Sequence, residues 1–300
     1  MKPTVFIHTN HKQKLGALVS RYSLRRNSRN PDAFDIRFIE VKDYPYMLAR
    51  EGQRYLRDGE MRPWLNDDLQ SFTPLRFAPP ELMGYQGRAV VIDPDVFAIG
   101  DILELLDRDI AGAAIMCRPK SGRKGRKGAW ASSVMLLDCA RLQHWQFERD
   151  FNQMFEDSGG GRPRRDYMDW VSLKLEDPAT IRPLETEWND FDHLGEETRL
   201  LHNTKRKTQP WKTGLKIDYR PADTFQLFPP RHWLRRARRA LFGDYRFAGT
   251  YAPHPDPAQE KLFFSLMREC LESGVITEAR LREEIEQGHL RRDALALVGT

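Results

Sequence analysis

Strand and helix patterns alternate at the start of the chain, and this order constrains the fold more than any other feature. The apolar run Val5-Phe6-Ile7 has the character of a buried strand. Residues 14–26 then place apolar side chains on one helical face, and residues 35–41 alternate with the period of a half-buried strand. Because strands that alternate with helices form layered sheets, we expect an α/β sheet with helices on its faces.

The middle of the chain continues this order. A helix is expected at residues 75–83, and an apolar strand follows at residues 88–92. Residues 110–116 and 133–137 are predicted to form two further core strands. Between them, residues 120–128 form a basic loop rich in glycine.

Composition sets limits on the class of protein. The chain has 300 residues, 40% of them hydrophobic, which suffices for one large α/β core or for a core with a small appendage. The net charge of +5 favours anionic partners such as nucleotide diphosphates, phospholipid headgroups or nucleic acid. Cys117, Cys139 and Cys270 lack the spacing of a disulfide framework or a zinc site. With no signal-peptide pattern and no membrane-span pattern, we expect a cytoplasmic protein.

The apolar strand at residues 88–92 ends at Asp93-Pro94-Asp95. Side chains two residues apart in extended chain project from the same side, so the two carboxylates can share one ligand. The proline restricts the backbone on both sides of it and stiffens the turn. A divalent cation between the carboxylates and a diphosphate would neutralise both. The same three residues are also typical of an ordinary strand-to-turn exit, so the pair alone leaves both interpretations open.

Several motifs flank the acid pair in a fixed order. Residues 76–82 read Arg-Phe-Ala-Pro-Pro-Glu-Leu, and residues 96–102 read Val-Phe-Ala-Ile-Gly-Asp-Ile. The later motifs are residues 130–138, Trp188-Asn189, Leu200-Leu201-His202 and Pro210-Trp211. Between about residue 4 and residue 214, the chain resembles the family-eight glycosyltransferases, which include glycogenin and bacterial lipopolysaccharide glucosyl- and galactosyltransferases. The resemblance implies a GT-A fold, with a mixed, mostly parallel sheet flanked by helices.

The resemblance also implies a set of site residues. Asp93 and Asp95 would be metal ligands and His202 the third ligand, a set that suits Mn²⁺ or Mg²⁺, of which we expect Mn²⁺. The nucleotide-binding residues implied are Thr9, Asn10 and Arg76. Thr9 and Asn10 follow the first strand, where α/β sheets commonly bind ligands. His8 and His11 are near enough to this turn to be minor candidates.

The chain departs from the family pattern near the end of the resemblance. Lys205 stands where the family has glycine, and Gln209 where it has lysine. The cations Lys205, Arg206 and Lys207 could contact the donor diphosphate instead. Ala131 and Ser133 also replace the usual residues near the sugar, so the donor sugar does not follow from the resemblance.

Asp166 and Asp169 lie near an acidic region of the family pattern, on a helix expected at residues 165–175. We expect Asp169 to be the carboxylate on the sugar side, with Asp166 as the second candidate. Because charged side chains on helices are mostly solvated, an ordinary surface acid is the alternative interpretation for each.

The function implied is retaining transfer of a hexose from a UDP-linked or other nucleotide-diphosphate sugar. The acceptor would be a glycan or a lipid-linked saccharide. A catalytically silent GT-A fold that binds nucleotide sugars or serves assembly is the alternative, because fold does not fix function.

The C-terminal part has a different character, and we expect a glycosyltransferase domain at residues 1–222 and a helical appendage at residues 223–300. Residues 231–241, from Arg231 to Leu241, carry five arginines beside apolar side chains. They could form a helix that contacts an anionic membrane peripherally, or one that packs on the domain. No nucleic-acid-binding signature accompanies the basic segments, so we predict no nucleic-acid partner. Two helices are expected further on, capped by Asp256 and Thr277.

Overall fold

The computed structural model describes residues 2–120, 129–157, 159, 163–219 and 249–299. The chain divides into two compact units, the first comprising Met1–Asp67 and Ser71–Asn203 and the second Asp68–Gln70 and Thr204–Thr300. The domain boundary predicted at residue 222 lies outside the described residues and stays a prediction.

A six-stranded sheet forms the centre of the first unit, in the order β2-β1-β5-β8-β7-β9. Its strands are β1 (Thr4–Thr9), β2 (Asp35–Glu40), β5 (Arg88–Ile92), β7 (Ile115–Pro119), β8 (Trp130–Asp138) and β9 (Ile181–Pro183). Strand β1 pairs in parallel with β2 and β5, and β7 pairs in parallel with β9. Strand β8 runs antiparallel between β5 and β7. This mixed sheet, flanked by helices, confirms the predicted α/β architecture.

The described part of the first unit also contains a three-stranded sheet, in the order β10-β11-β6, and a β3–β4 hairpin. These strands are β6 (Val96–Ala98), β10 (Asp190–Phe191), β11 (Leu200–His202), β3 (Arg54–Arg57) and β4 (Glu60–Pro63). The α-helices are α1 (Lys14–Arg26), α2 (Pro45–Leu48), α3 (Pro79–Leu82), α4 (Leu103–Leu106), α5 (Phe147–Asn152) and α6 (Tyr167–Val171). The 3-10 helices are η1 (His11–Gln13), η2 (Val41–Asp43), η3 (Thr73–Phe77), η4 (Cys139–Arg141), η5 (Pro178–Thr180) and η6 (Thr186–Asn189).

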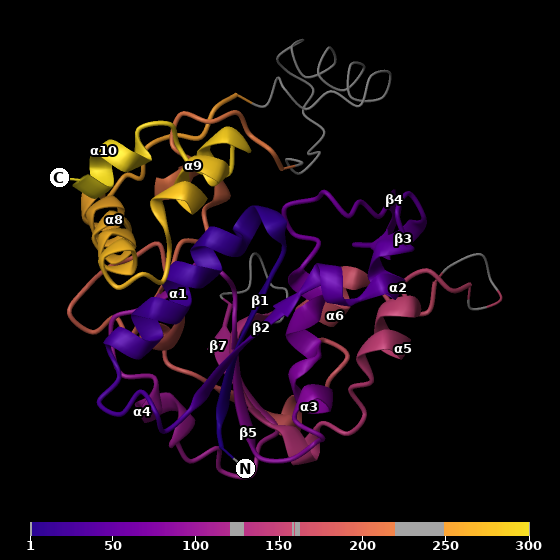
Figure 1. Cartoon of the computed structure of the whole chain (residues 1–300). Helices are drawn as coiled ribbons and strands as arrows, with labels where there is room; N and C mark the ends of the chain where they lie inside the picture. The colour runs from indigo at the N-terminus through magenta and orange to yellow at the C-terminus, as the bar shows by residue number, and fades with distance from the viewer. Residues whose placement is uncertain (1, 121–128, 158, 160–162, 220–248, 300) are drawn as a thin grey trace. The chain divides into compact units, whose positions relative to one another are not determined.

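Apolar side chains cover both faces of the six-stranded sheet. Successive residues of a strand point to opposite faces, so Phe6 joins one core whereas Val5 and Ile7 join the other. Residues from α3, α5 and α6 pack on the first face, and residues from α1 and α4 pack on the second (Figure 1). Burial on both faces explains the uninterrupted apolar runs of residues 5–7 in β1 and 89–92 in β5.

Helix α1 also holds one edge of β6, the strand that follows the acid pair. Ser20 Oγ donates to the Val96 carbonyl oxygen at 2.6 Å, and Ser23 Oγ accepts the Ala98 N–H at 2.8 Å. Asn27 Nδ2 donates to the Ala98 carbonyl oxygen at 2.8 Å. The three polar residues are three and four positions apart, so they share one helix face. They satisfy backbone groups that a short strand would otherwise leave without partners.

Three predicted elements differ in the structure. The helix expected at residues 165–175 is the shorter α6 (Tyr167–Val171), after which Leu173 adopts a positive φ of 57°. The helix expected at residues 75–83 is the 3-10 helix η3 followed by the four-residue helix α3. Two consecutive prolines at the start of α3 lack the N–H groups that would continue a helix from η3. The strand expected at residues 110–116 begins only at Ile115. Ala111 and Gly112 adopt positive φ angles of 49° and 75°, which turn the chain before the strand.

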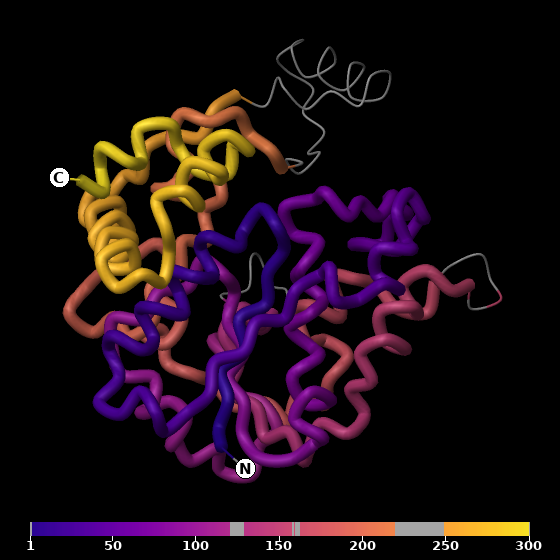
Figure 2. Tube along the Cα trace, viewed as in Figure 1, coloured from indigo at the N-terminus to yellow at the C-terminus, as the bar shows by residue number. Residues whose placement is uncertain are grey.

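The described part of the second unit is mostly helical. Its helices are α8 (Pro257–Glu272), α9 (Glu278–Glu286), α10 (Ala294–Gly299), η7 (Arg206–Thr208) and η8 (Pro210–Lys212). The side chains of Asp256 and Thr277 accept backbone N–H groups at the starts of α8 and α9, which confirms both predicted N-caps. Helices α8 and α10 lie side by side at the yellow end of the trace (Figure 2), and Arg268 Nε donates to the Val298 carbonyl oxygen between them.

Some predictions concern residues outside the described ranges. These are residues 121–128 of the basic loop and residues 231–241, for which we expect an amphipathic helix that could contact a membrane. In the ranges that the structure describes, no helix combines the length and the apolar character needed to cross a bilayer.

Candidate metal centre

The acid pair lies where the chain leaves one sheet and enters the other. Asp93 follows the last residue of β5, and Asp95 precedes the first residue of β6. Strands β6 and β11 are antiparallel, with Val96 opposite His202. The N–H of Asn203 donates to the Asp95 carbonyl oxygen at 3.1 Å and extends this pairing. The register therefore carries His202 to the acid pair from a distant part of the sequence.

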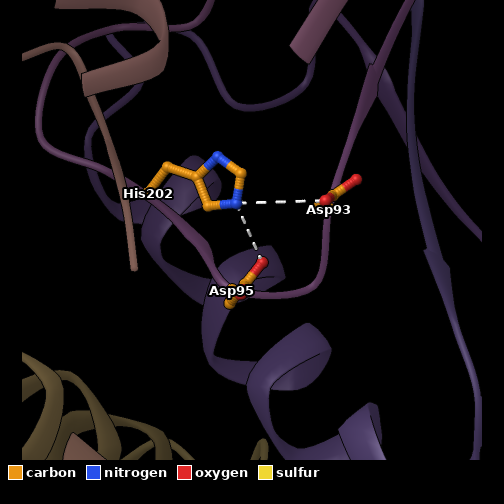
Figure 3. A group of neighbouring side chains, drawn as sticks. All are labelled: Asp93, Asp95 and His202. Atoms are coloured by element: carbon orange, nitrogen blue, oxygen red, sulfur yellow. Dashed lines mark ion pairs between the residues drawn. The ribbon is translucent and has the colours of Figure 1, made fainter. Parts of the chain in front are cut away.

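Asp93, Asp95 and His202 form a compact cluster (Figure 3). His202 Nε2 lies 3.3 Å from Asp95 Oδ1 and 3.9 Å from Asp93 Oδ2. One ligand atom from each residue lies within 4.8 Å of the other two. The imidazole is buried, whereas the side chains of Asp93 and Asp95 are 15% and 13% exposed. The cluster is thus built into the protein but reaches solvent through its acids.

Asp93 has two further partners. Arg76 Nη2 donates to its two carboxylate oxygens at 2.7 and 3.1 Å, and Arg76 Nη1 donates to Ser132 Oγ at 2.7 Å. His8 Nε2 lies 2.9 Å from Asp93 Oδ1. The parallel register of β1 and β5 accounts for this contact, because it pairs Ile7 with Ile92 and so brings the next residues, His8 and Asp93, beside each other. Arg76, predicted to face the nucleotide, thus forms an ion pair with Asp93, the first acid of the pair.

These contacts set the charges of the cluster. Burial disfavours the ionised form of Asp93, but the Arg76 guanidinium and the hydrogen bond from His8 outweigh it and hold the pKa of Asp93 below its usual range. Burial lowers the pKa of His8 and so favours the neutral imidazole, although the Asp93 carboxylate beside it acts in the opposite direction. For His202, burial is outweighed by the charges of Asp95 and Asp93, which raise the pKa. The cluster therefore favours a positive charge at His202 Nε2, from a proton or from a cation.

Polar and aromatic residues hold the other side of His202. Its Nδ1 lies 2.8 Å from Asn189 Oδ1, and Asn189 Nδ2 donates to Ser133 Oγ at 3.0 Å. The Ser133 carbonyl oxygen accepts the Asp93 N–H at 3.0 Å. The ring of Phe191 packs edge-on against the imidazole, with 5.5 Å between ring centroids. Both nitrogens of His202 thus face protein partners.

The predicted nucleotide-binding turn lies at the end of β1. Thr9 and Asn10 are both buried. Asn10 Oδ1 accepts the N–H groups of Lys12 and Gln13, and Asn10 Nδ2 donates to Ser71 Oγ at 3.0 Å. Asn10 therefore caps η1 and shapes the turn. Contact of this turn with a nucleotide stays a prediction.

The two acids predicted near the sugar have different surroundings. Asp166 caps α6, accepting two backbone N–H groups within that helix and two more from Asp58 and Gly59 in the β3–β4 turn. Burial opposes ionisation of Asp166, but these four bonds prevail and lower its pKa. Asp169 is 43% exposed, and its carboxylate pairs with Lys174 at 2.5 Å. The catalytic roles of Asp166 and Asp169 stay predictions.

Lys205, Arg206 and Lys207 belong to the second unit, in and beside η7. Lys205 and Lys207 are exposed, and the Arg206 guanidinium lies over the Tyr219 ring at 5.0 Å. Their contact with a donor diphosphate stays a prediction.

Two residues of the centre were not assigned a role from the sequence. His8 was noted only for its place near the nucleotide turn, and Asn189 only as part of a motif. The signal for His8 is a polar residue at the end of an apolar strand, at the same position as Asp93 on the neighbouring strand. For Asn189, a contact with His202 becomes visible only when β10 and β11 are paired.

No protein-family model matches the chain, and no curated protein sequence matches it. Among solved structures, galactosyltransferase LgtC in complex with donor and acceptor sugar analogues is 12% identical, over 69% of this chain and 89% of its own, with a TM-score of 0.48. Glycosyltransferase GlyE of Streptococcus pneumoniae TIGR4 is 13% identical, over 92% of this chain and 64% of its own, with a TM-score of 0.48. Mouse xyloside xylosyltransferase 1 is 14% identical, over 68% of this chain and 98% of its own, with a TM-score of 0.43. Identities this low, with TM-scores below 0.5, assign neither a family nor an activity.

Proposed function

We propose that this protein is a divalent-metal-dependent glycosyltransferase of the GT-A type, in which Asp93, Asp95 and His202 hold the ion against the diphosphate of a nucleotide sugar. The single observation that carries the proposal is the cluster itself, in which ligand atoms of two neighbouring carboxylates and of an imidazole from a distant segment lie within 4.8 Å of one another. Gathering carboxylates costs free energy unless a positive charge compensates them. The donor is proposed to be a UDP-linked hexose, and the acceptor a glycan or a lipid-linked saccharide.

The donor atoms suit a divalent ion. Oxygen and nitrogen ligands lie about 2.0–2.6 Å from such ions, so two ligands of one ion are at most about 5 Å apart. The distances of 3.3 and 3.9 Å from His202 Nε2 to the two acids fall inside this limit. Two carboxylate oxygens with one imidazole favour Mn²⁺, with Mg²⁺ as the alternative.

In the proposed mechanism, charged groups of the protein stabilise the opposite charges that develop during the reaction. When bound, the ion supplies Lewis-acid stabilisation of the leaving diphosphate. The cations proposed to stabilise the same negative charge are Lys205, Arg206 and Lys207. Asp169, with Asp166 as second candidate, is proposed to stabilise positive charge on the sugar ring. The residues proposed to bind the nucleotide are Thr9, Asn10 and Arg76. Transfer is proposed to retain the anomeric configuration.

Calorimetric titration with UDP, UDP-glucose, UDP-galactose and GDP-mannose, with and without Mn²⁺, tests the proposal. We expect binding of a UDP-sugar that requires Mn²⁺, is lost in Asp95→Ala, and is accompanied by slow hydrolysis of the donor. Asp107→Ala, which removes an acid with 65% side-chain exposure that pairs with Arg29, is the matched control. Metal-dependent binding without hydrolysis would favour a catalytically silent nucleotide-sugar-binding protein. Nucleotide-sugar binding of equal affinity with and without Mn²⁺ would contradict the proposed metal site.

A further inference from the structure

The two nitrogens of the His202 ring face different chemical groups. Nε2 faces the carboxylates of Asp95 and Asp93, and Nδ1 lies 2.8 Å from Asn189 Oδ1. His202 is 4% exposed and Asn189 is fully buried, so bulk water competes little for this contact. In a neutral imidazole one nitrogen carries the proton and the other a lone pair. Because an amide oxygen only accepts hydrogen bonds, the contact requires the proton on Nδ1.

Asn189 is itself held by several partners. Its Nδ2 donates to Ser133 Oγ at 3.0 Å, and its carbonyl oxygen accepts a hydrogen bond from Arg118 Nη1 at 2.6 Å. The reverse orientation of the Asn189 amide would turn its NH₂ group toward His202 Nδ1. The ring proton would then lie on Nε2, where it excludes a metal. The two amide orientations therefore correspond to opposite tautomers of His202.

We propose that Asn189 is a positioning residue that keeps the proton of neutral His202 on Nδ1 and thereby directs the Nε2 lone pair at a cation between Asp93 and Asp95. This inference rests on the proposed function, because it describes how the third ligand of that site is set. Hydrogen-bond partners of a ligating imidazole fix its tautomer and typically alter metal affinity 10–100-fold.

Ser133 supports the same arrangement from a different strand. Its Oγ accepts a hydrogen bond from the Asn189 amide, and its carbonyl oxygen accepts the Asp93 N–H at 3.0 Å. The antiparallel register of β5 and β8 places this carbonyl beside Asp93. One residue of β8 therefore contacts both the backbone of an acid ligand and the residue that orients the imidazole.

Three variants separate the tautomer from general packing. Asn189→Leu removes the acceptor, Asn189→Asp keeps an acceptor oxygen for Nδ1–H, and Ser133→Ala removes the hydroxyl that orients the amide. In calorimetry with UDP present, we expect the Mn²⁺ dissociation constant to rise about 10–100-fold in Asn189→Leu and to change less than about threefold in Asn189→Asp. Ser133→Ala should give an intermediate rise.

Ring ¹⁵N chemical shifts of the metal-free protein report the tautomer without reference to metal binding. They are recorded at a pH high enough to leave His202 neutral, and His202→Gln assigns the signal. We expect the proton on Nδ1 in the wild type and in Asn189→Asp. In Asn189→Leu we expect it on Nε2, where it can donate to Asp95.

Each outcome of these measurements has a defined meaning. A proton on Nε2 in the wild type overturns the inference, as do an unchanged tautomer and unchanged Mn²⁺ affinity in Asn189→Leu. If Asn189→Leu does not fold, a shift toward Nε2–H in Ser133→Ala supports the inference, and the absence of that shift overturns it. If the wild type shows the expected tautomer but binds neither Mn²⁺ nor UDP, the proposed function fails, and with it the metal role of Asn189, while the Asn189–His202 hydrogen bond stands.

Discussion

A proton and a cation compete for one nitrogen at His202. Burial alone would lower the pKa of this imidazole, but the charges of Asp95 and Asp93 raise it above the ordinary value of 6.5. Arg76 and His8 hold the pKa of Asp93 below its usual range, so Asp93 is ionised wherever His202 titrates. Loss of the proton from His202 therefore leaves negative charge that a metal ion can compensate.

The raised pKa predicts how stability depends on pH. A group with a raised folded-state pKa contributes stability that is fully present below its unfolded pKa, about 6.5 for histidine, and is lost as the pH rises through the folded pKa. We expect the Tm of the metal-free protein to fall over this window, and the Tm increase caused by Mn²⁺ to grow over the same window. Melts in Mn²⁺ and in EDTA across pH measure both. His202→Gln should weaken both trends, and unchanged trends in this variant would refute the assignment.

Substitution of Asp166 should lower stability, whereas substitution of Asp169 should lower activity. Asp166→Ala removes the acceptor of four backbone N–H groups, so we expect the free energy of unfolding to fall by about 1–2 kcal/mol, as for the loss of a helix N-cap. Asp169→Ala removes a half-exposed acid and should leave stability nearly unchanged while it lowers kcat. Urea unfolding and donor hydrolysis measure the two effects. Full activity in Asp169→Ala would exclude that acid from the proposed mechanism.

Helix α1 and strands β6 and β11 act together to position the acid turn. A Cβ atom at Gly16 of α1 would lie 2.9 Å from the Pro94 carbonyl oxygen, closer than ordinary contact allows. Seven residues further along the helix, Ser23 binds the backbone of β6, whose other edge pairs with β11. The absence of a side chain at Gly16 thus lets the helix approach the turn between Asp93 and Asp95.

Gly16→Ala should disturb the metal centre more than it disturbs the helix. Alanine gains about 1 kcal/mol of helix propensity over glycine, but the added methyl must displace a backbone oxygen in a turn stiffened by proline. We expect weaker Mn²⁺ binding with a smaller change in Tm, measured by calorimetry and thermal melts. Arg26→Ala, at an exposed position of the same helix, is the control and should leave Mn²⁺ affinity unchanged. Wild-type affinity in Gly16→Ala would show that the turn tolerates the displacement.

Elements decided by nearby residues were predictable, whereas pairings between distant segments were not. The caps Asp256 and Thr277 followed from local hydrogen bonding. Strand β11 has three residues, too few to show a period, and its pairing with β6 depends on backbone hydrogen bonds between distant segments. The position of His202 was therefore predicted only through the family resemblance. The contacts of His8 and Asn189 require the strand registers, which no local pattern encodes.

The two compact units of the molecule carry different parts of the proposed chemistry. The first unit contains the acid cluster with the residues that brace it. The second contains Lys205, Arg206 and Lys207, and its described part also includes an ion-pair network in which Arg291 pairs with Glu260 and Asp293. In the proposed function, the metal ligands belong to the first unit, and the residues proposed to contact the diphosphate, Lys205, Arg206 and Lys207, belong to the second.

Neutralising the basic segment at residues 205–207 tests whether these cations contribute to binding of the donor but not to binding of the metal. In a triple variant with Lys205→Gln, Arg206→Gln and Lys207→Gln, we expect UDP affinity in Mn²⁺ to fall and to depend less on salt, because screening acts on the charges removed. Mn²⁺ binding without nucleotide should persist, since the ligands of the acid cluster are intact. Both quantities are measured by calorimetry at low and high salt.

The control for that variant must change the net charge equally. Lys261→Gln, Arg282→Gln and Arg292→Gln remove the same number of positive charges from exposed positions of the same unit. An equal loss of UDP affinity in both triple variants would mean that net charge, and not the segment, attracts the nucleotide. Unchanged UDP affinity in the first variant would instead mean that the cation at the acid cluster is the main counter-charge of the diphosphate. Lys205, which stands where the family pattern has glycine, would then have no role in donor binding.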